Sequence, residues 1–153
     1  MKIEEKLKEM GIDLPPAVTP VANYVPSVRT GNLVFLSGHG PARGDGSWIT
    51  GKVGADMTID QGYEAAKSVA IVLLGSLKAE IGDLDKVRRI VKLLGMVNCT
   101  SDFTDQPKVI NGASDFLVEV FGDNGKHARS AVGMNALPGN IPVEIEMIVE
   151  VED

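Results

Sequence analysis

The segment from residue 59 to residue 81 carries the strongest pattern in the sequence and constrains the fold more than any other stretch. Its apolar residues recur at the spacing of one helix face, namely Ala65, Val69, Val72, Leu73 and Leu77. Thr58 and Gln61 form a capping box at its start, and Gly82 provides a stop at its end. We therefore expect a long helix over residues 59–81 whose apolar side packs on the rest of a folded domain.

Shorter patterns around this helix predict the other elements. We expect a short helix over residues 3–10, strands over residues 24–28, 32–37, 88–99, 129–136 and 143–151, and a second long helix over residues 107–121. This order predicts an α+β fold with a single sheet and two helices packed on one face. We treat residues 1–16 as an N-terminal helical extension and residues 17–153 as one α+β domain, because the chain has the usual length of a single domain.

The last two predicted strands indicate which side chains share a face. The final strand alternates, with apolar residues on one side at Val143, Ile145, Met147, Val149 and Val151. Glu144 lies on the opposite side of that strand. In the preceding strand we place Val132 and Met134 toward the helices and Arg129 on the other face. Arg129 and Glu144 then share the sheet face away from the helices, which only another subunit could bury.

Charge and cysteine content exclude several classes of protein. The formal net charge is -6 and the sequence pI is about 4.9, so phosphate backbones and anionic membranes are repelled. Cys99 is the only cysteine, which fits a reducing compartment. The N-terminus carries acidic residues where a signal peptide needs an apolar run, and no stretch has the roughly 18–20 apolar residues of a membrane span. We therefore expect a cytoplasmic protein without nucleic-acid or membrane partners.

The usual catalytic templates are missing from the sequence. His39 and His127 are the only histidines, and neither has metal-ligand spacing with Cys99. The sequence contains neither a complete Gly-x-x-x-x-Gly-Lys-Ser/Thr phosphate loop nor a Gly-x-Ser-x-Gly nucleophile turn. We therefore expect no metal site.

One segment near the end of the chain carries a more specific motif. It runs Ala128-Arg129-Ser130-Ala131-Val132, then Leu137-Pro138, and then Val143-Glu144-Ile145-Glu146. Together with Tyr24 and the segment from Gly31 to Gly38, it resembles the RidA (YjgF-like) family of imine/enamine deaminases over about residues 17–151. The resemblance implies a chorismate-mutase-like fold and a homotrimer with pockets between subunits. It also implies a last strand that is inserted into the sheet instead of pairing with its predecessor.

The resemblance further implies a reaction and a set of site residues. Family substrates are small 2-imino acids or their enamine tautomers, which water converts to a 2-keto acid and ammonia without a cofactor. Arg129 would hold the substrate carboxylate through two parallel hydrogen bonds, and Glu144 would activate the water. The residues expected to line the pocket are Tyr24, Ser37, Gly38, Asn111 and Ala131, of which Ala131 occupies a position that is often cysteine in the family.

Each of these residues also has a purely structural interpretation. Arg129 can pair with a surface glutamate, and alternating glutamates such as Glu144 often form a solvated strand face. Ser37 and Gly38 can simply end a strand in a tight turn. Three other functions stay open: a non-catalytic module that binds a small carboxylate, an endoribonuclease, and a structural trimer with an inactive pocket. The acidic charge and the lack of a basic stripe with stacking aromatic residues disfavour the ribonuclease.

Overall fold

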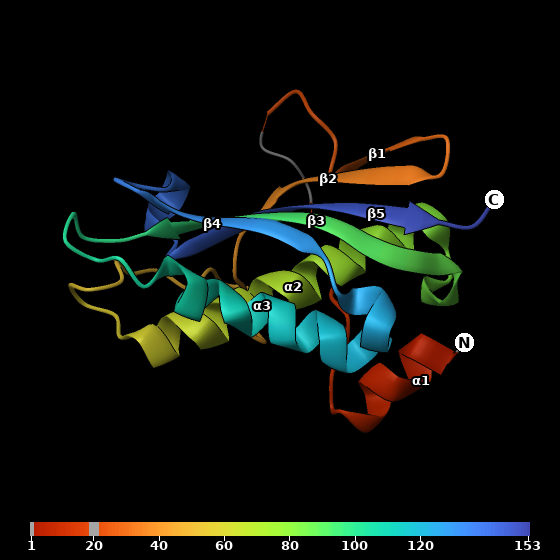
Figure 1. Cartoon of the computed structure of the whole chain (residues 1–153), viewed down its shortest axis with the longest axis horizontal. Coiled ribbons are helices and arrows are strands. Elements are labelled where there is room, and N and C mark those ends of the chain that lie inside the picture. Colours follow the sequence, from red (N-terminus) through yellow and green to blue (C-terminus); the bar gives the residue numbers. More distant parts are fainter. Residues whose placement is uncertain (1, 19–21) are drawn as a thin grey trace.

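A computed structural model describes residues 2–18 and 22–153, in which one mixed sheet lies against two long helices (Figure 1). The elements in chain order are α1 (Lys2–Glu9), β1 (Ser27–Thr30), β2 (Leu33–His39), α2 (Ile59–Ile81), η1 (Leu84–Lys86), β3 (Val87–Asn98), α3 (Gln106–Phe121), η2 (Gly122–Gly125), β4 (Ala128–Met134), η3 (Pro138–Asn140) and β5 (Val143–Val151). This order confirms the predicted α+β fold. The first strand begins later than predicted, after Pro26, which lacks an N–H for the strand ladder.

The sheet has the strand order β1-β2-β5-β3-β4. The last strand in sequence, β5, runs antiparallel to both β2 and β3 and so occupies the centre of the sheet. It does not pair with β4, in agreement with the inserted strand that the family resemblance implies. The pairing of β4 is parallel and involves β3 alone, which leaves β4 as an edge strand.

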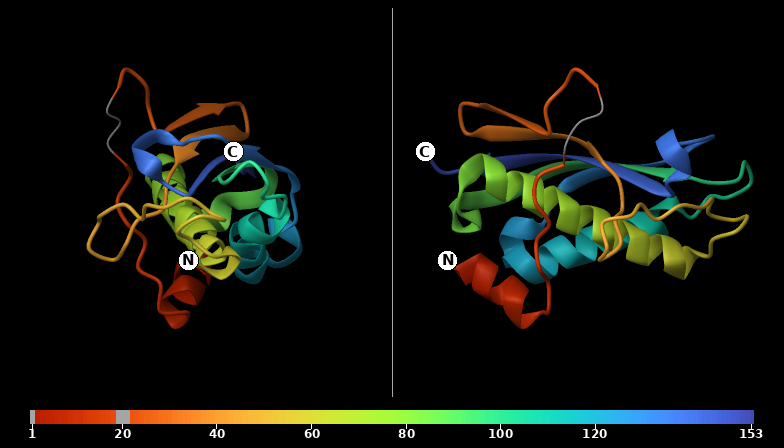
Figure 2. Two further views of the ribbon diagram at one scale, coloured as in Figure 1. Left: turned by 90° about the vertical axis from the view of Figure 1, so that its left-hand side faces the viewer. Right: turned by 180° about the vertical axis from the view of Figure 1, so that it is seen from behind.

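Helices α2 and α3 cover one face of the sheet, as two opposite views show (Figures 1 and 2). The capping box predicted for α2 is present: Thr58 Oγ1 accepts from the Gln61 N–H, and Gln61 Oε1 accepts from the Thr58 N–H. The two helices approach closely because Gly112 of α3 lies against the backbone of Tyr63 in α2. Among the described residues, no helix combines the length and apolarity that crossing a bilayer requires.

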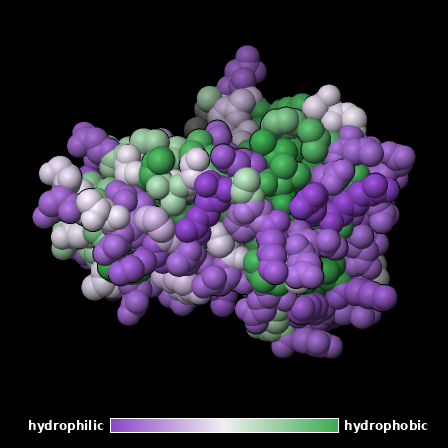
Figure 3. Space-filling model, viewed as in Figure 1, coloured by the Kyte–Doolittle hydropathy of each residue, from purple (hydrophilic) through white to green (hydrophobic). Residues whose placement is uncertain are grey.

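The opposite face of the sheet, here called the open face, carries exposed apolar side chains. Val28 is 54% exposed, Phe35 is 42% exposed and Val132 is 38% exposed. Figure 3 shows hydrophobic surface on this side of the sheet, over β1 and β2. Helix α1 does not cover it, because α1 contacts α3 and η1 on the helical side, where Leu7 is buried in the core. No element within residues 2–18 and 22–153 packs on the open face.

Candidate functional site

Arg129 lies on the edge strand β4 with its guanidinium against α3. Its Nη1 donates to Asn111 Oδ1 and to Ser114 Oγ, both at 2.9 Å, and its Nη2 donates to the Pro107 carbonyl at 3.3 Å. In the sheet, Arg129 pairs with Leu93, whose side chain is fully buried in the core beneath the helices. The prediction that Arg129 faces away from the helices is therefore wrong.

The local sequence explains why a charged side chain fits on the helical side. Asn111 and Ser114 are three residues apart in α3, so both present polar atoms to the same neighbour. On β4 the positions that share a face with Arg129 are small, namely Ala131 and Gly133. A methyl group at Gly133 would lie 2.7 Å from the Gln106 amide nitrogen and 3.0 Å from Cys99 Sγ, so these side chains would have to shift to admit it. The arginine thus spans a narrow gap to the polar stripe of the helix.

His127 completes a hydrogen-bonded group with these residues. Its Nε2 lies 2.9 Å from Ser114 Oγ, and its Nδ1 lies 2.6 Å from the Gly125 carbonyl. Burial lowers the pKa of His127, and so does the nearby charge of Arg129, while the bond to the Gly125 carbonyl acts in the opposite direction. Ser114, His127 and Arg129 line a cavity of about 350 Å³ together with Val118 and Lys126. This cavity is lined by cationic side chains and suits a small anion.

Ser114 and His127 were not among the residues predicted from the sequence. Their spacing contains a usable signal. Ser114 follows Asn111 by one helical turn, and His127 precedes Arg129 by two positions, the period of a strand. Two polar stripes on neighbouring elements would have indicated a shared site only if α3 were already known to pack on β4.

Glu144 lies on the open face, near the start of β5. The buried side chain of Asn98 holds this region by donating to the Ile141 carbonyl at 3.2 Å. The Glu144 carboxylate lies directly over Gly38, because a side chain at Gly38 would meet its Oε2 atom and come within 3.0 Å of its Cδ. Burial raises the pKa of Glu144, and the negative charge of Glu146 raises it further. The carboxyl group therefore has raised proton affinity, which suits general acid–base chemistry.

The segment around Ser37 connects Gly38, which lies against Glu144, to the chain that carries Tyr24. The pairing of β2 with β5 is interrupted between Leu36 and His39, which is the signature of a β-bulge. Ser37 donates from its N–H to the Pro26 carbonyl at 2.9 Å and from its Oγ to the Val25 carbonyl at 2.6 Å. These bonds hold the chain that carries Tyr24, which is 48% exposed, against the end of β2.

The structure thus brings the predicted residues together in two groups, not one. Arg129 contacts Asn111 on the helical side, with Ala131 next along the same face of β4. Glu144 lies with Gly38 and Ser37 on the open face. Arg129 is paired with Leu93 and Glu144 with Met96, so the two groups are also offset along β3 by roughly 10 Å at 3.3 Å per residue. Within one chain, Arg129 and Glu144 cannot act on the same small ligand.

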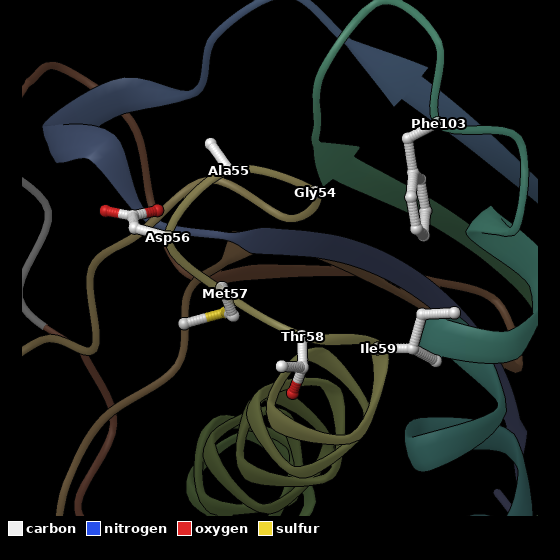
Figure 4. A pocket seen from close by; sticks show the side chains of 7 residues that line it. All are labelled: Gly54, Ala55, Asp56, Met57, Thr58, Ile59 and Phe103. Atoms are coloured by element: carbon white, nitrogen blue, oxygen red, sulfur yellow. The ribbon is translucent and has the colours of Figure 1, made fainter.

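Two other features of the described residues offer no comparable chemistry. A cavity of about 430 Å³ lies at the start of α2, between the segment 54–59 and Phe103 (Figure 4), but its one carboxylate, Asp56, accepts the Lys52 N–H. Glu4, Asp83 and Asp85 lie close enough to share a cation. Most of their oxygens accept backbone N–H groups, as at Leu84 and Ile3, whereas Glu4 Oε2 is buried without a hydrogen-bond partner.

Comparisons with known proteins point to one family. The family described as "YjgF/chorismate mutase-like, putative endoribonuclease" matches residues 4–151. Protein TCP17 of Trypanosoma cruzi is 40% identical over 99% of this chain and 96% of its own length. A 2-iminobutanoate/2-iminopropanoate deaminase of Dermatophagoides farinae is 30% identical over 92% of this chain and 95% of its own length. A crystal structure of a protein of unknown function from Agrobacterium tumefaciens has a TM-score of 0.91 and 44% identity, covering 99% of this chain and 93% of that one.

Proposed function

Because the chain belongs to the YjgF/chorismate mutase-like family, we propose that it hydrolyses small 2-imino acids, or their enamine tautomers, to 2-keto acids and ammonia. The observation that carries this proposal is the anchored guanidinium of Arg129, whose bonds to Asn111 and Ser114 fix it beside a cavity. The similarity to a mite protein named as an imine deaminase supports the same reaction class.

Arg129 holds the substrate carboxylate in this proposal. A guanidinium that is already fixed by neutral neighbouring acceptors loses little freedom when it binds an anion, so more of the interaction energy appears as affinity. Two parallel hydrogen bonds from a planar fork also set the orientation of the imine carbon relative to the attacking water.

Glu144 activates that water. Water adds to the protonated imine carbon and gives one proton to the carboxylate, which forms a hydroxy-amine; the carboxylic acid then protonates the nitrogen, the C–N bond breaks to release ammonia, and the remaining hydroxyl proton leaves as the keto C=O bond forms. The raised pKa of Glu144 makes the first transfer easier, because a more basic carboxylate takes the water proton more readily. Tyr24, Ser37 and Gly38 line the same side of the pocket, and Ala131 contributes its backbone.

A second copy of the chain completes the site. Arg129 and Glu144 lie on opposite faces of one sheet, so a shared substrate requires Arg129 of one copy and Glu144 of another. The exposed apolar residues of the open face, such as Phe35 and Val28, fit burial against a second copy. A homotrimer, closed by a heterologous contact repeated three times, satisfies both requirements.

The test is a deamination assay combined with subunit mixing. A pyridoxal-dependent dehydratase generates the imino acid in place, and keto-acid release is followed with and without the protein. Arg129→Ala and Glu144→Gln are each expected to lose activity. Co-expressed as differently tagged chains, they should regain about a quarter of the wild-type rate, because one random pairing in four joins an intact Arg129 to an intact Glu144. A mixed oligomer with no activity would refute the shared pocket.

The same assay separates the enzyme from a module that only binds carboxylates. A binding module would take up pyruvate through Arg129 without accelerating keto-acid release from any imino acid tested. If the Arg129→Ala variant still accelerated keto-acid release, the proposed mechanism would be contradicted even though the assigned reaction was correct.

A further inference from the structure

The two histidines of the chain make the same pattern of hydrogen bonds. His39 Nδ1 lies 2.5 Å from the carbonyl of Ser37, two residues earlier, and its Nε2 lies 2.8 Å from Ser76 Oγ on α2. His127 Nδ1 lies 2.6 Å from the carbonyl two residues earlier, and its Nε2 lies 2.9 Å from Ser114 Oγ on α3. The difference is that Ser114 also contacts Arg129, so only the second pair supports a charged side chain within the described part of the chain.

The proton positions in the second pair follow from its partners. A carbonyl oxygen only accepts, so the Nδ1 of His127 carries the proton that is donated to Gly125. In the neutral ring Nε2 is then an acceptor, and Ser114 donates its single hydroxyl proton to it. The lone pairs of Ser114 Oγ are thereby directed at Arg129, whose Nη1 donates to them at 2.9 Å. Neutral His127 thus fixes the direction in which the serine accepts.

The remaining donors of Arg129 define where a ligand can bind. Both protons of Nη1 are used, by Asn111 and Ser114, and one proton of Nη2 reaches the Pro107 carbonyl. The second Nη2 proton and the Nε proton have no acceptor among residues 2–18 and 22–153. Nε and Nη2 thus each keep a donor for a ligand, and the Nε–Nη2 edge of a guanidinium matches the spacing of the two oxygens of a carboxylate.

We propose that Ser114 and His127 are positioning residues, which together hold Arg129 so that its Nε–Nη2 edge receives a carboxylate. This inference rests on the proposed role of Arg129 as the carboxylate holder and adds how that role is achieved. The Ser114 hydroxyl affects the ligand by holding Arg129 in place, and the His127 imidazole does so by orienting the Ser114 hydroxyl.

The arrangement also couples carboxylate binding to the protonation of His127. The charged groups that line the cavity beside the ring are Arg129 on β4 and Lys126 just before it, and Lys126 is paired with Asp123 at 3.1 Å. The residues of α3 that line the same cavity are Ser114 and Val118, and neither is charged. A bound anion offsets this positive surrounding, so it raises the pKa of His127. By linkage, pyruvate binds more tightly as the pH falls through the titration of the ring.

The first measurement is the affinity of the full chain for pyruvate by calorimetry. Ser114→Ala is expected to weaken binding about tenfold, because Arg129 loses one of the two acceptors that fix Nη1. Ser114→Thr keeps the hydroxyl and should recover most of the affinity. Ser68→Ala is the matched control, since Ser68 is a half-buried helix serine that bonds to the backbone of Ala42, in contact with none of the Arg129 cluster.

The second measurement is the titration of the two histidine ring signals by NMR. Pyruvate should raise the pKa of His127 and leave the His39 signal unchanged, which makes His39 an internal control in the same sample. His127→Gln should remove the increase in pyruvate affinity at low pH. A residue that only stabilised the fold would produce neither effect.

The outcomes separate this inference from the proposed function. Failure of the wild-type chain to bind pyruvate at all would overturn the carboxylate role of Arg129, and this inference with it. The inference alone would be overturned if pyruvate binding were lost in Arg129→Ala but unchanged in Ser114→Ala, and if pyruvate did not shift the pKa of His127. Weaker binding in Ser114→Ala, recovery in Ser114→Thr and a shifted His127 titration would establish it.

Discussion

Gly38→Ala tests the role of Glu144 by displacing its carboxylate instead of removing it. The new methyl group would overlap Glu144 Oε2 and lie 3.0 Å from Cδ, whereas ordinary contacts begin at 3.4 Å. The carboxylate must therefore swing away by about 1 Å to restore van der Waals separation. The obstacle is the end of a flexible side chain, so the backbone of β2 need not move.

The expected effect on catalysis is large and the expected effect on stability is small. Misplacing a catalytic group by about 1 Å can cost on the order of 100-fold in rate, so kcat for imine hydrolysis should fall by about that factor. Carboxylate binding should be largely retained, because the Arg129 that holds the carboxylate keeps its own bonds to Asn111 and Ser114. Gly38 has no positive φ, and replacing such a glycine by alanine stabilises by about 0.4–1 kcal/mol through the unfolded state.

The assay measures keto-acid release from dehydratase-generated imine, alongside thermal unfolding of the same samples. Gly44→Ala is the matched control, because Gly44 also lacks a positive φ and has no atom within 4 Å of the position of a new methyl group. A Gly38→Ala enzyme with wild-type kcat and wild-type stability would refute the proposal that Glu144 must hold its present position to activate water.

Three further predictions concern other parts of the structure. Gly112→Ala should lower the free energy of unfolding in urea by about 2 kcal/mol or more, because the methyl group would meet the Tyr63 backbone and separate α2 from α3. Glu146→Gln should move the acid limb of the pH–rate profile to lower pH, since the charge of Glu146 helps to raise the pKa of Glu144. Burial lowers the pKa of His39 below its ordinary 6.5, so the unfolded chain takes up the proton first; the free energy of unfolding should fall as the pH drops below 6.5, and less steeply in His39→Gln.

The regular elements were predictable because their signals are local. The capping box of Thr58 and Gln61 and the stop at Gly82 lie within the chain segment that they define, and α2 begins and ends where they indicate. The apolar alternation of residues 143–151 likewise predicts β5 with its buried face correctly. The central position of β5 is a long-range property, and it was anticipated only through the resemblance to a family.

The face of Arg129 could not be predicted, because the alternation of β4 is misleading. Val132 looks like a core residue and Arg129 looks like a surface residue, yet Val132 is 38% exposed and Arg129 is turned toward α3. On this strand the helical side carries small residues such as Gly133, where a larger side chain would displace the Gln106 amide. The polar partners that α3 offers to Arg129 outweigh hydrophobicity at this edge.

The division of the site between two faces yields a prediction about which variants complement one another. Gly38 and Glu144 belong to one chain and touch across the pairing of β2 with β5, so Gly38→Ala damages the Glu144 of its own chain. Arg129 can meet that carboxylate only from another chain. Gly38→Ala co-expressed with Arg129→Ala should therefore recover about a quarter of the wild-type rate, because the Arg129→Ala chain still supplies an undisturbed Glu144.

Co-expression of Gly38→Ala with Glu144→Gln should recover nothing, because every chain then carries a damaged carboxylate. Gel filtration of each mixture verifies that the chains assemble. If both mixtures recovered activity equally, the effect of Gly38→Ala would not pass through Glu144 of the same chain. If neither did, Arg129 and Glu144 would not meet across the boundary between two copies.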